Sequence, residues 1–215
     1  MFIKQVRKII SKMTTSVKIP PINIGIEPIL LNMPQELYSD AIYFRNQANK
    51  TVEHAIRSRY KRVSLICFCA STEAWLNTEL RGCISQKTTR HPYEQEILNF
   101  MEDITINRPP DKYSSIRDRL YNCAGFVFTG QYINWSTHRI TAFENYIELS
   151  KARNMIAHYV TKYREIVYDQ HFDPSQLSVT VTNSIDNAPK VVFDLCQELH
   201  SLNSTVAIPS WAVPA

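Results

Sequence analysis

Apolar side chains recur every three or four residues along most of this chain, which is the pattern of amphipathic helices. The most apolar run, from Val63 to Leu80, suits the central helix of a bundle. The pattern predicts helices over residues 35–59, 62–84, 93–104, 115–123, 141–163 and 191–202. Because the chain also has only four glycines, we expect an all-α fold, an up-and-down helical bundle, rather than a sandwich or a barrel.

Three segments depart from the helical pattern. Residues 1–34 contain prolines at positions 20, 21, 28 and 34, which break helices and favour an extended arm. Residues 125–135 are rich in aromatic side chains and are predicted to form a packed, irregular connection, while residues 177–182 alternate apolar and polar positions as a strand does. We therefore expect an arm at 1–34, a bundle at 35–173, and a strand-plus-helix C-terminal extension at 174–215 that packs on the bundle.

Composition indicates a single globular domain with an extension. The 215 residues are 44% hydrophobic and 11% aromatic, which is enough to bury a sizeable core. The five cysteines lack the spacing of metal ligands, and neither a transmembrane segment nor a signal peptide is found. We expect a cytoplasmic protein with no cofactor and no metal. Contact with a membrane is the less favoured interpretation.

Positive charge is concentrated at the N-terminus. The chain has a formal charge of +4, but residues 1–26 contain five basic side chains and no acidic one, which leaves −1 for the remainder. Lys4, Arg7 and Lys8 are therefore candidates for contact with RNA phosphates. The same segment is also compatible with a solvated end, or with a short amphipathic helix that packs on the body or lies on a membrane surface.

The predicted helix at 141–163 carries a polar group on a face that is otherwise apolar. At about 100° per residue, Arg153, Asn154 and His158 lie in one sector. Phe143 and Ile147 precede them in that sector, so the polar residues extend a face expected to be buried. A buried guanidinium must be paired or must meet a charged ligand, because an isolated buried charge is too costly.

The segment from Arg153 to His158 reads R-N-x-x-A-H and resembles the signature of the HEPN family, the higher eukaryotes and prokaryotes nucleotide-binding domains. The resemblance implies a metal-independent endoribonuclease that leaves a 2′,3′-cyclic phosphate, in the manner of a toxin or host-defence ribonuclease. It also implies a homodimer with a composite active site, and an antitoxin or regulatory protein as a possible partner. Some family members carry H-x-Y for modification by that partner, whereas this chain has His158, Tyr159 and Val160.

Each residue of the motif has a chemical role in such a reaction. His158 would transfer protons, since histidine titrates near neutral pH. Arg153 would clamp a phosphate with its planar guanidinium, and Asn154 would orient the imidazole or bind the scissile phosphate. One histidine per chain falls short of the two proton-transfer groups that the reaction prefers, and a dimer supplies the second.

Further candidates are weighed against plainer readings. Glu73 is either a carboxylate that pairs helices or a partner that orients Arg153, while Tyr159 is a possible substrate contact beside the motif histidine. Arg164, seven residues before His171, marks a weaker second site. The aromatic residues of 125–135 either pack in the core or stack on RNA bases. The alternative function is a catalytically silent RNA- or nucleotide-binding or scaffold module, in which His158 is a satisfied core histidine.

Overall fold

The computed structural model describes residues 32–166 and 174–214, and within its helices the side chains of 157–166 and 174–182 are outside the description. The described residues belong to one compact unit, Asn32–Ala215. The basic residues Lys4, Arg7 and Lys8 lie outside the described part of the chain, as does most of the predicted arm at 1–34.

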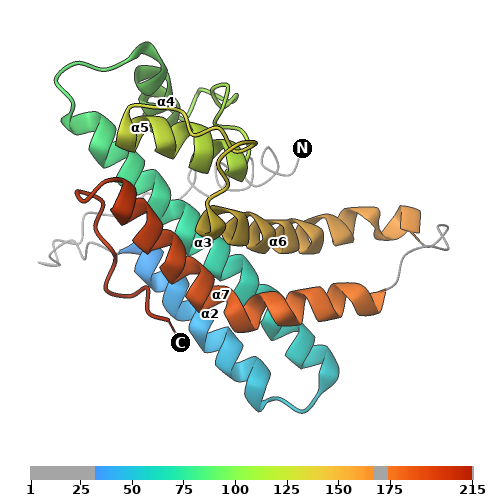
Figure 1. Cartoon of the computed structure of the whole chain (residues 1–215). Coiled ribbons are helices and arrows are strands. Elements are labelled where there is room, and N and C mark those ends of the chain that lie inside the picture. The colour runs from blue at the N-terminus through green and yellow to red at the C-terminus, as the bar shows by residue number, and fades with distance from the viewer. Residues whose placement is uncertain (1–31, 167–173, 215) are drawn as a thin grey trace, which may run out of the picture. The chain divides into compact units, whose positions relative to one another are not determined.

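The regular structure is helical throughout the described residues, which confirms the all-α prediction. Its elements are α2 (Met33–Lys50), α3 (His54–Gln86), α4 (Pro92–Glu102), the π-helical segment η1 (Asp118–Ala124), α5 (Gly125–Thr129), α6 (Thr141–Ile166) and α7 (Pro174–Leu202). The long helix α3 packs against α2, α4, α6 and α7, and α6 lies beside α7 (Figure 1). The most apolar stretch of the sequence therefore occupies the centre of the bundle.

The predicted helix at 35–59 is wrong in one respect, because the structure divides this stretch between α2 and α3. Thr51 has extended backbone angles, and its hydroxyl and N–H both donate to the Gln47 carbonyl oxygen, at 2.7 and 3.1 Å. The Arg57 Nε then donates to the Thr51 carbonyl oxygen at 2.8 Å. Thr51 and Val52 are both β-branched, which lowers their helix propensity, and these side-chain hydrogen bonds replace those of a continuous helix.

The predicted strand at 177–182 is also wrong, because the single helix α7 spans Pro174–Leu202. In the sequence, Leu177 and Val181 continue the three- and four-residue spacing of Ile185, Ala188 and Val192, and these last three side chains are buried. Six residues of alternating apolar and polar side chains are compatible with both a strand and a helix. The longer apolar stripe that includes them favours the helix. Pro189 lies inside α7, which bends midway along its length (Figure 1).

The predicted helix at 115–123 and the irregular connection after it also differ from the structure. Ser115 and Asp118 exchange hydrogen bonds at the start of the helical segment. The π-helical segment η1 continues directly into α5, so residues 125–129 are helical. Gly130, with φ of +78°, ends α5 in a left-handed conformation that glycine adopts without strain.

The core is built on α3 and is closed by the C-terminal segment. Its largest fully buried side chains include Phe68, Leu76, Leu80, Tyr121, Phe143 and Tyr146. The Tyr38 ring packs against Trp211, with ring centroids 5.0 Å apart, and its hydroxyl donates to the Val213 carbonyl oxygen at 3.1 Å. Among the described residues, no helix is both long and apolar enough to cross a membrane.

Candidate functional site

The face of α6 that carries the motif is buried up to the motif itself. Phe143, Tyr146 and Ile147 are buried, and one turn later Ser150 is fully buried. Arg153 follows on the same face, with 27% of its side chain exposed. The expectation that the polar residues extend a buried face is thus confirmed for Arg153, so its guanidinium needs partners.

Glu73 of α3 supplies one of those partners and joins two arginines. Its Oε1 accepts a hydrogen bond from Nη2 of Arg153 at 2.7 Å, and its Oε2 accepts one from Nη1 of Arg119 at 3.1 Å. The Arg153 Nη2 also donates to the Ser150 hydroxyl at 3.2 Å. Less than a third of each charged side chain is exposed. Glu73 therefore both pairs α3 with α6 and orients Arg153, which agrees with both of its sequence interpretations, and the trio keeps a net positive charge.

A hollow of about 590 Å³ opens beside this trio, where α3, α6 and the start of the η1 segment meet. Its charged lining consists of four cationic side chains and one carboxylate, namely Arg117, Arg119, Lys151, Arg153 and Glu73. The remaining lining includes Ser114, Ser115, Ser150, Asn154 and two apolar side chains. Hydroxyl, amide and guanidinium groups converging in one cavity are the chemistry that recognises an oxyanion. We call this cavity the basic hollow.

Two guanidinium groups of the basic hollow are incompletely satisfied within the described residues. The Nε atoms of Arg153 and Arg117 are buried and have no hydrogen-bond partner there. Arg117 is held by an ion pair between its Nη2 and Glu144 Oε2 at 3.2 Å, and its guanidinium lies 4.7 Å from the Trp135 ring centroid. Buried polar groups are normally paired. Both arginines are thus held through Nη2, while their Nε atoms are shielded from solvent.

The structure brings three of the predicted site residues together: Arg153, Asn154 and Glu73 all line the basic hollow. His158 belongs to α6 and lies one helical turn after Asn154, but its side chain is outside the described residues. The same holds for the side chains of Tyr159 and Arg164 on that helix.

Sequence reasoning missed Arg117, Arg119 and the two serines that precede them. Their segment was predicted as an ordinary helix, and nothing in its spacing indicates a partner on α6. Two arginines within four residues of a pair of serines were the one available signal, because hydroxyl and guanidinium groups together are common in phosphate sites.

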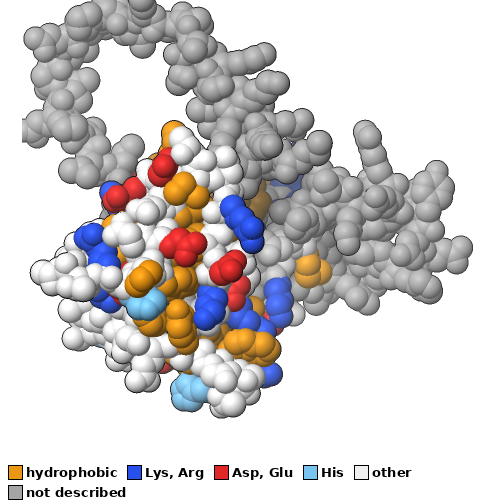
Figure 2. All heavy atoms as spheres, turned by 90° about the horizontal axis from the view of Figure 1, so that it is seen from above, with side chains coloured by type: hydrophobic (Ala, Val, Ile, Leu, Met, Phe, Trp, Pro, Cys, Tyr) orange, Lys and Arg blue, Asp and Glu red, His pale blue; other side chains and the backbone are white. Residues whose placement is uncertain are grey.

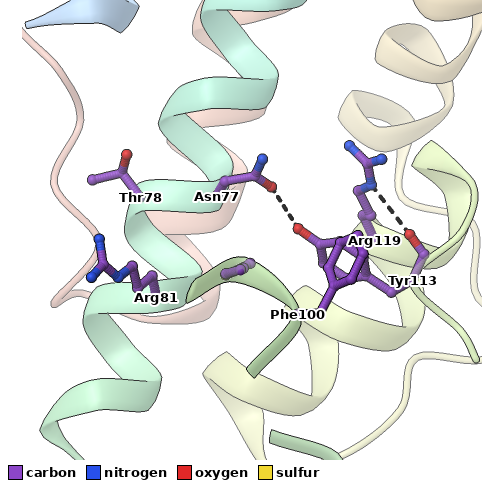
Figure 3. A pocket seen from close by; sticks show the side chains of 7 residues that line it. Asn77, Thr78, Arg81, Phe100, Tyr113 and Arg119 are labelled. Atoms are coloured by element: carbon purple, nitrogen blue, oxygen red, sulfur yellow. Dashed lines mark hydrogen bonds between the residues drawn. The ribbon is translucent and has the colours of Figure 1, made fainter. Parts of the chain in front are cut away.

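A second, smaller hollow of about 390 Å³ lies on the other side of Arg119. Its lining comes from α3, the end of α4 and the segment that follows, and includes Asn77, Arg81, Phe100 and Tyr113 (Figure 3). The Tyr113 hydroxyl donates to Asn77 Oδ1 at 2.7 Å, and Arg119 Nε donates to the Tyr113 carbonyl oxygen at 3.2 Å. Arg119 therefore lines both cavities. We call this second cavity the amide hollow.

Burial keeps a tyrosine and a cysteine that interact with these arginines protonated. It raises the pKa of Tyr113 to about 12 against the opposing charge of Arg119, and the pKa of Cys69 to about 12 against that of Arg153. The Tyr113 hydroxyl therefore remains a hydrogen-bond donor to Asn77 at neutral pH. Neither group titrates in the range that proton transfer at neutral pH requires.

The aromatic connection is partly exposed. Trp135 and Tyr132 have 40% and 42% of their surface exposed, whereas Phe128 is buried. Phe128 therefore packs in the core, and the two exposed rings are compatible with the alternative role of stacking on bases. Figure 2 views the end of the body that carries α4 and α5, where hydrophobic side chains alternate with basic and acidic ones. Of these aromatic residues, Trp135 is tied to the basic hollow, through the guanidinium of Arg117.

No cluster of three His, Cys, Asp or Glu side chains suited to a metal ion occurs in the described part of the chain. The five cysteines are free thiols, of which Cys69, Cys123 and Cys196 are buried. The functional interpretation therefore depends on the motif and on the geometry of the basic hollow. Comparisons of the chain with protein-family models, curated proteins and solved structures found no match.

Proposed function

We propose that this protein is a metal-independent endoribonuclease of the HEPN type, acting on RNA in the cytoplasm. The observation that carries the proposal is the position of the motif: Arg153 and Asn154 line a cavity with three further cations, and His158 follows one turn later on α6. An RNA phosphate supplies the negative charge that this lining is suited to bind.

The proposed reaction is an intramolecular transfer of the phosphoryl group. The ribose 2′-oxygen attacks the adjacent phosphorus as a histidine removes its proton, and the bond to the 5′-oxygen of the next nucleotide breaks as that oxygen receives a proton. The products are a 2′,3′-cyclic phosphate and a 5′-hydroxyl end. Arg153, held by Glu73 and Ser150, stabilises the charge that develops on the phosphate oxygens.

A symmetric dimer completes this proposal, because it brings a second His158 to the site. The exposed surface of α6 along the motif segment supports such a contact. Met155 has 44% of its surface exposed there, next to the exposed Asn154 and one turn from the exposed Lys151. An exposed methionine on a motif-bearing helix is suited to packing against a symmetry mate.

The deciding experiment is cleavage of a labelled RNA in the presence of EDTA by the wild-type chain and by His158→Ala, with His138→Ala as a matched control from an exposed position. We expect His158→Ala to lower the rate about 10²-fold or more, the scale of general acid–base catalysis, and His138→Ala to leave it unchanged. Cleavage that survives His158→Ala, or that stops with the chelator, would contradict the proposal.

One observation favours a second function. Arg153 is already paired with Glu73 at 2.7 Å, as in a structural ion pair, and this is compatible with a catalytically silent RNA- or nucleotide-binding module. Both functions predict RNA binding that weakens on Arg153→Ala, but only the enzyme yields a cyclic phosphate end. If the chain is a toxin or defence nuclease with an antitoxin or regulatory protein, its expression alone should stop growth and His158→Ala should restore it.

A further inference from the structure

Polar side chains continue along α3 beyond the basic hollow. Glu73, Asn77 and Arg81 are spaced four residues apart, so they follow one another over about 12 Å of the helix axis. Glu73 lines the basic hollow, whereas Asn77 and Arg81 line the amide hollow. The same face of α3 therefore serves both cavities.

The two cavities differ in chemistry although they share Arg119. The basic hollow contains most of the charge, while the amide hollow combines the amide of Asn77 with the aromatic ring of Phe100. In Figure 3, Asn77 on α3 points toward the Tyr113 hydroxyl, and Phe100 lies beside Tyr113. A nucleotide has the same two parts, a charged phosphate and an uncharged aromatic base.

The amide of Asn77 is held so that its donors are available. The Tyr113 hydroxyl donates to Asn77 Oδ1 at 2.7 Å and so fixes the orientation of the amide. No hydrogen bond from Nδ2 to another described residue accompanies it, and the side chain is only partly buried. Phe100 is likewise only partly buried, with its ring centroid 5.7 Å from that of Tyr113. An oriented amide and an aromatic face are the groups that proteins use to read unpaired bases.

We infer that the amide hollow is a nucleobase subsite for the nucleotide whose phosphate binds at Arg119 and Arg153. The inference rests on the proposed function to the extent that RNA phosphate occupies the basic hollow. It specifies a substrate that is single-stranded at the site, because a base in a duplex is stacked on its neighbours and has its pairing edge occupied, so it cannot stack on Phe100 or accept from Asn77. Phe100 contributes stacking, and Asn77 Nδ2 donates to an acceptor on the base edge.

Binding without cleavage tests this inference. The probes are the four ribonucleoside 3′-monophosphates and ribose 5-phosphate, titrated into the full chain by calorimetry. The variants are Phe100→Leu and Asn77→Asp, with Phe44→Leu and Asn187→Asp as controls. Phe44 is also a partly buried phenylalanine, on α2, and Asn187 is an exposed asparagine on α7. Asn77→Asp keeps the acceptor for Tyr113 and replaces the free donor with an acceptor.

The wild type should bind at least one nucleotide more tightly than ribose 5-phosphate. Phe100→Leu should weaken the binding of that nucleotide about fivefold or more, the scale of one stacked base. The affinity for ribose 5-phosphate should remain unchanged. Asn77→Asp should change the order of preference among the four bases, and the controls should change neither. Equal binding of nucleotides and ribose 5-phosphate by the wild type, or equal losses for both in Phe100→Leu, would overturn the subsite. Failure of the RNA-cleavage test would overturn only the proposed function.

Discussion

Replacing Glu73 with glutamine should lower the stability of the protein and at the same time tighten its binding of anions. Glu73 accepts two charge-assisted hydrogen bonds, from Arg153 at 2.7 Å and Arg119 at 3.1 Å. Glutamine keeps one acceptor oxygen but turns its amide nitrogen toward the other guanidinium. The substitution therefore removes one hydrogen bond and leaves two neighbouring cations without their shared carboxylate.

The magnitude follows from the burial of the three side chains, which are 19%, 23% and 27% exposed. A hydrogen bond to a charged group contributes about 1.5 to 3 kcal/mol, and breaking a fully buried ion pair costs about 3 to 5 kcal/mol. For this partly exposed trio we expect a loss of about 2 to 3 kcal/mol. At roughly 2 to 4 °C per kcal/mol for a chain of this size, Tm should fall by roughly 4 to 12 °C.

The control is Glu148→Gln, which breaks the pair between Glu148 and Lys151 at 2.6 Å, where both side chains are more than half exposed. Exposed pairs contribute little, so its Tm should remain close to that of the wild type. Calorimetry with inorganic phosphate should show binding to Glu73→Gln about threefold tighter or more, because the lining of the basic hollow loses its one carboxylate. A Glu73→Gln variant as stable as the control, or one that binds phosphate more weakly than the wild type, would refute the reasoning.

Three further predictions concern the site, the thiols and a turn. Arg153→Lys should recover only part of the RNA affinity that Arg153→Ala loses, because an ammonium cannot hydrogen-bond Glu73, Ser150 and a phosphate in the same plane; full recovery in a filter-binding assay would contradict this. Burial raises the pKa of three thiols, those of Cys69, Cys123 and Cys196, to about 12. The stability that their protonated forms provide should therefore be complete below pH 9 and be lost between pH 9 and 12, as urea unfolding at several pH values would show. Gly130→Ala should cost about 1 kcal/mol, measured by urea unfolding, through its φ of +78° alone, since no neighbouring atom lies within 4 Å of the added Cβ; an unchanged free energy of unfolding would show that the turn adjusts.

The helices of the bundle could be predicted from apolar spacing wherever a long stripe is buried. The element α6 agrees closely with the predicted range of 141–163, because Phe143, Tyr146 and Ile147 are all core residues. The break after Lys50 could not be predicted, since no proline or glycine marks it and the hydrogen bonds of Thr51 arise only in the folded chain. The strand prediction failed because six residues are too few to separate a period of two from one of 3.6.

The candidate site could be predicted only on the helix that carries the motif. Arg153 and Asn154 follow from their place on the apolar face of α6, and Glu73 was considered because it interrupts the apolar central helix. Arg117 and Arg119 were missed because they are separated from Arg153 by more than thirty positions in the sequence. Their convergence depends on the π-helical segment and on packing against α6, and local periodicity contains neither.

The contact of Tyr38 with Trp211 and Val213 sets the order in which the core can be completed during synthesis. The helices α2 and α3 leave the ribosome early, and their contact with each other is local enough to form at once. The Tyr38 ring, however, gains its cover from residues made about 170 positions later. At about 5 to 20 residues per second, α2 and α3 wait for roughly 10 to 30 s with this part of their apolar surface open. A nascent chain stalled before Trp211 should therefore remain a substrate for chaperones, although the described helices, which end at Leu202, have already been made.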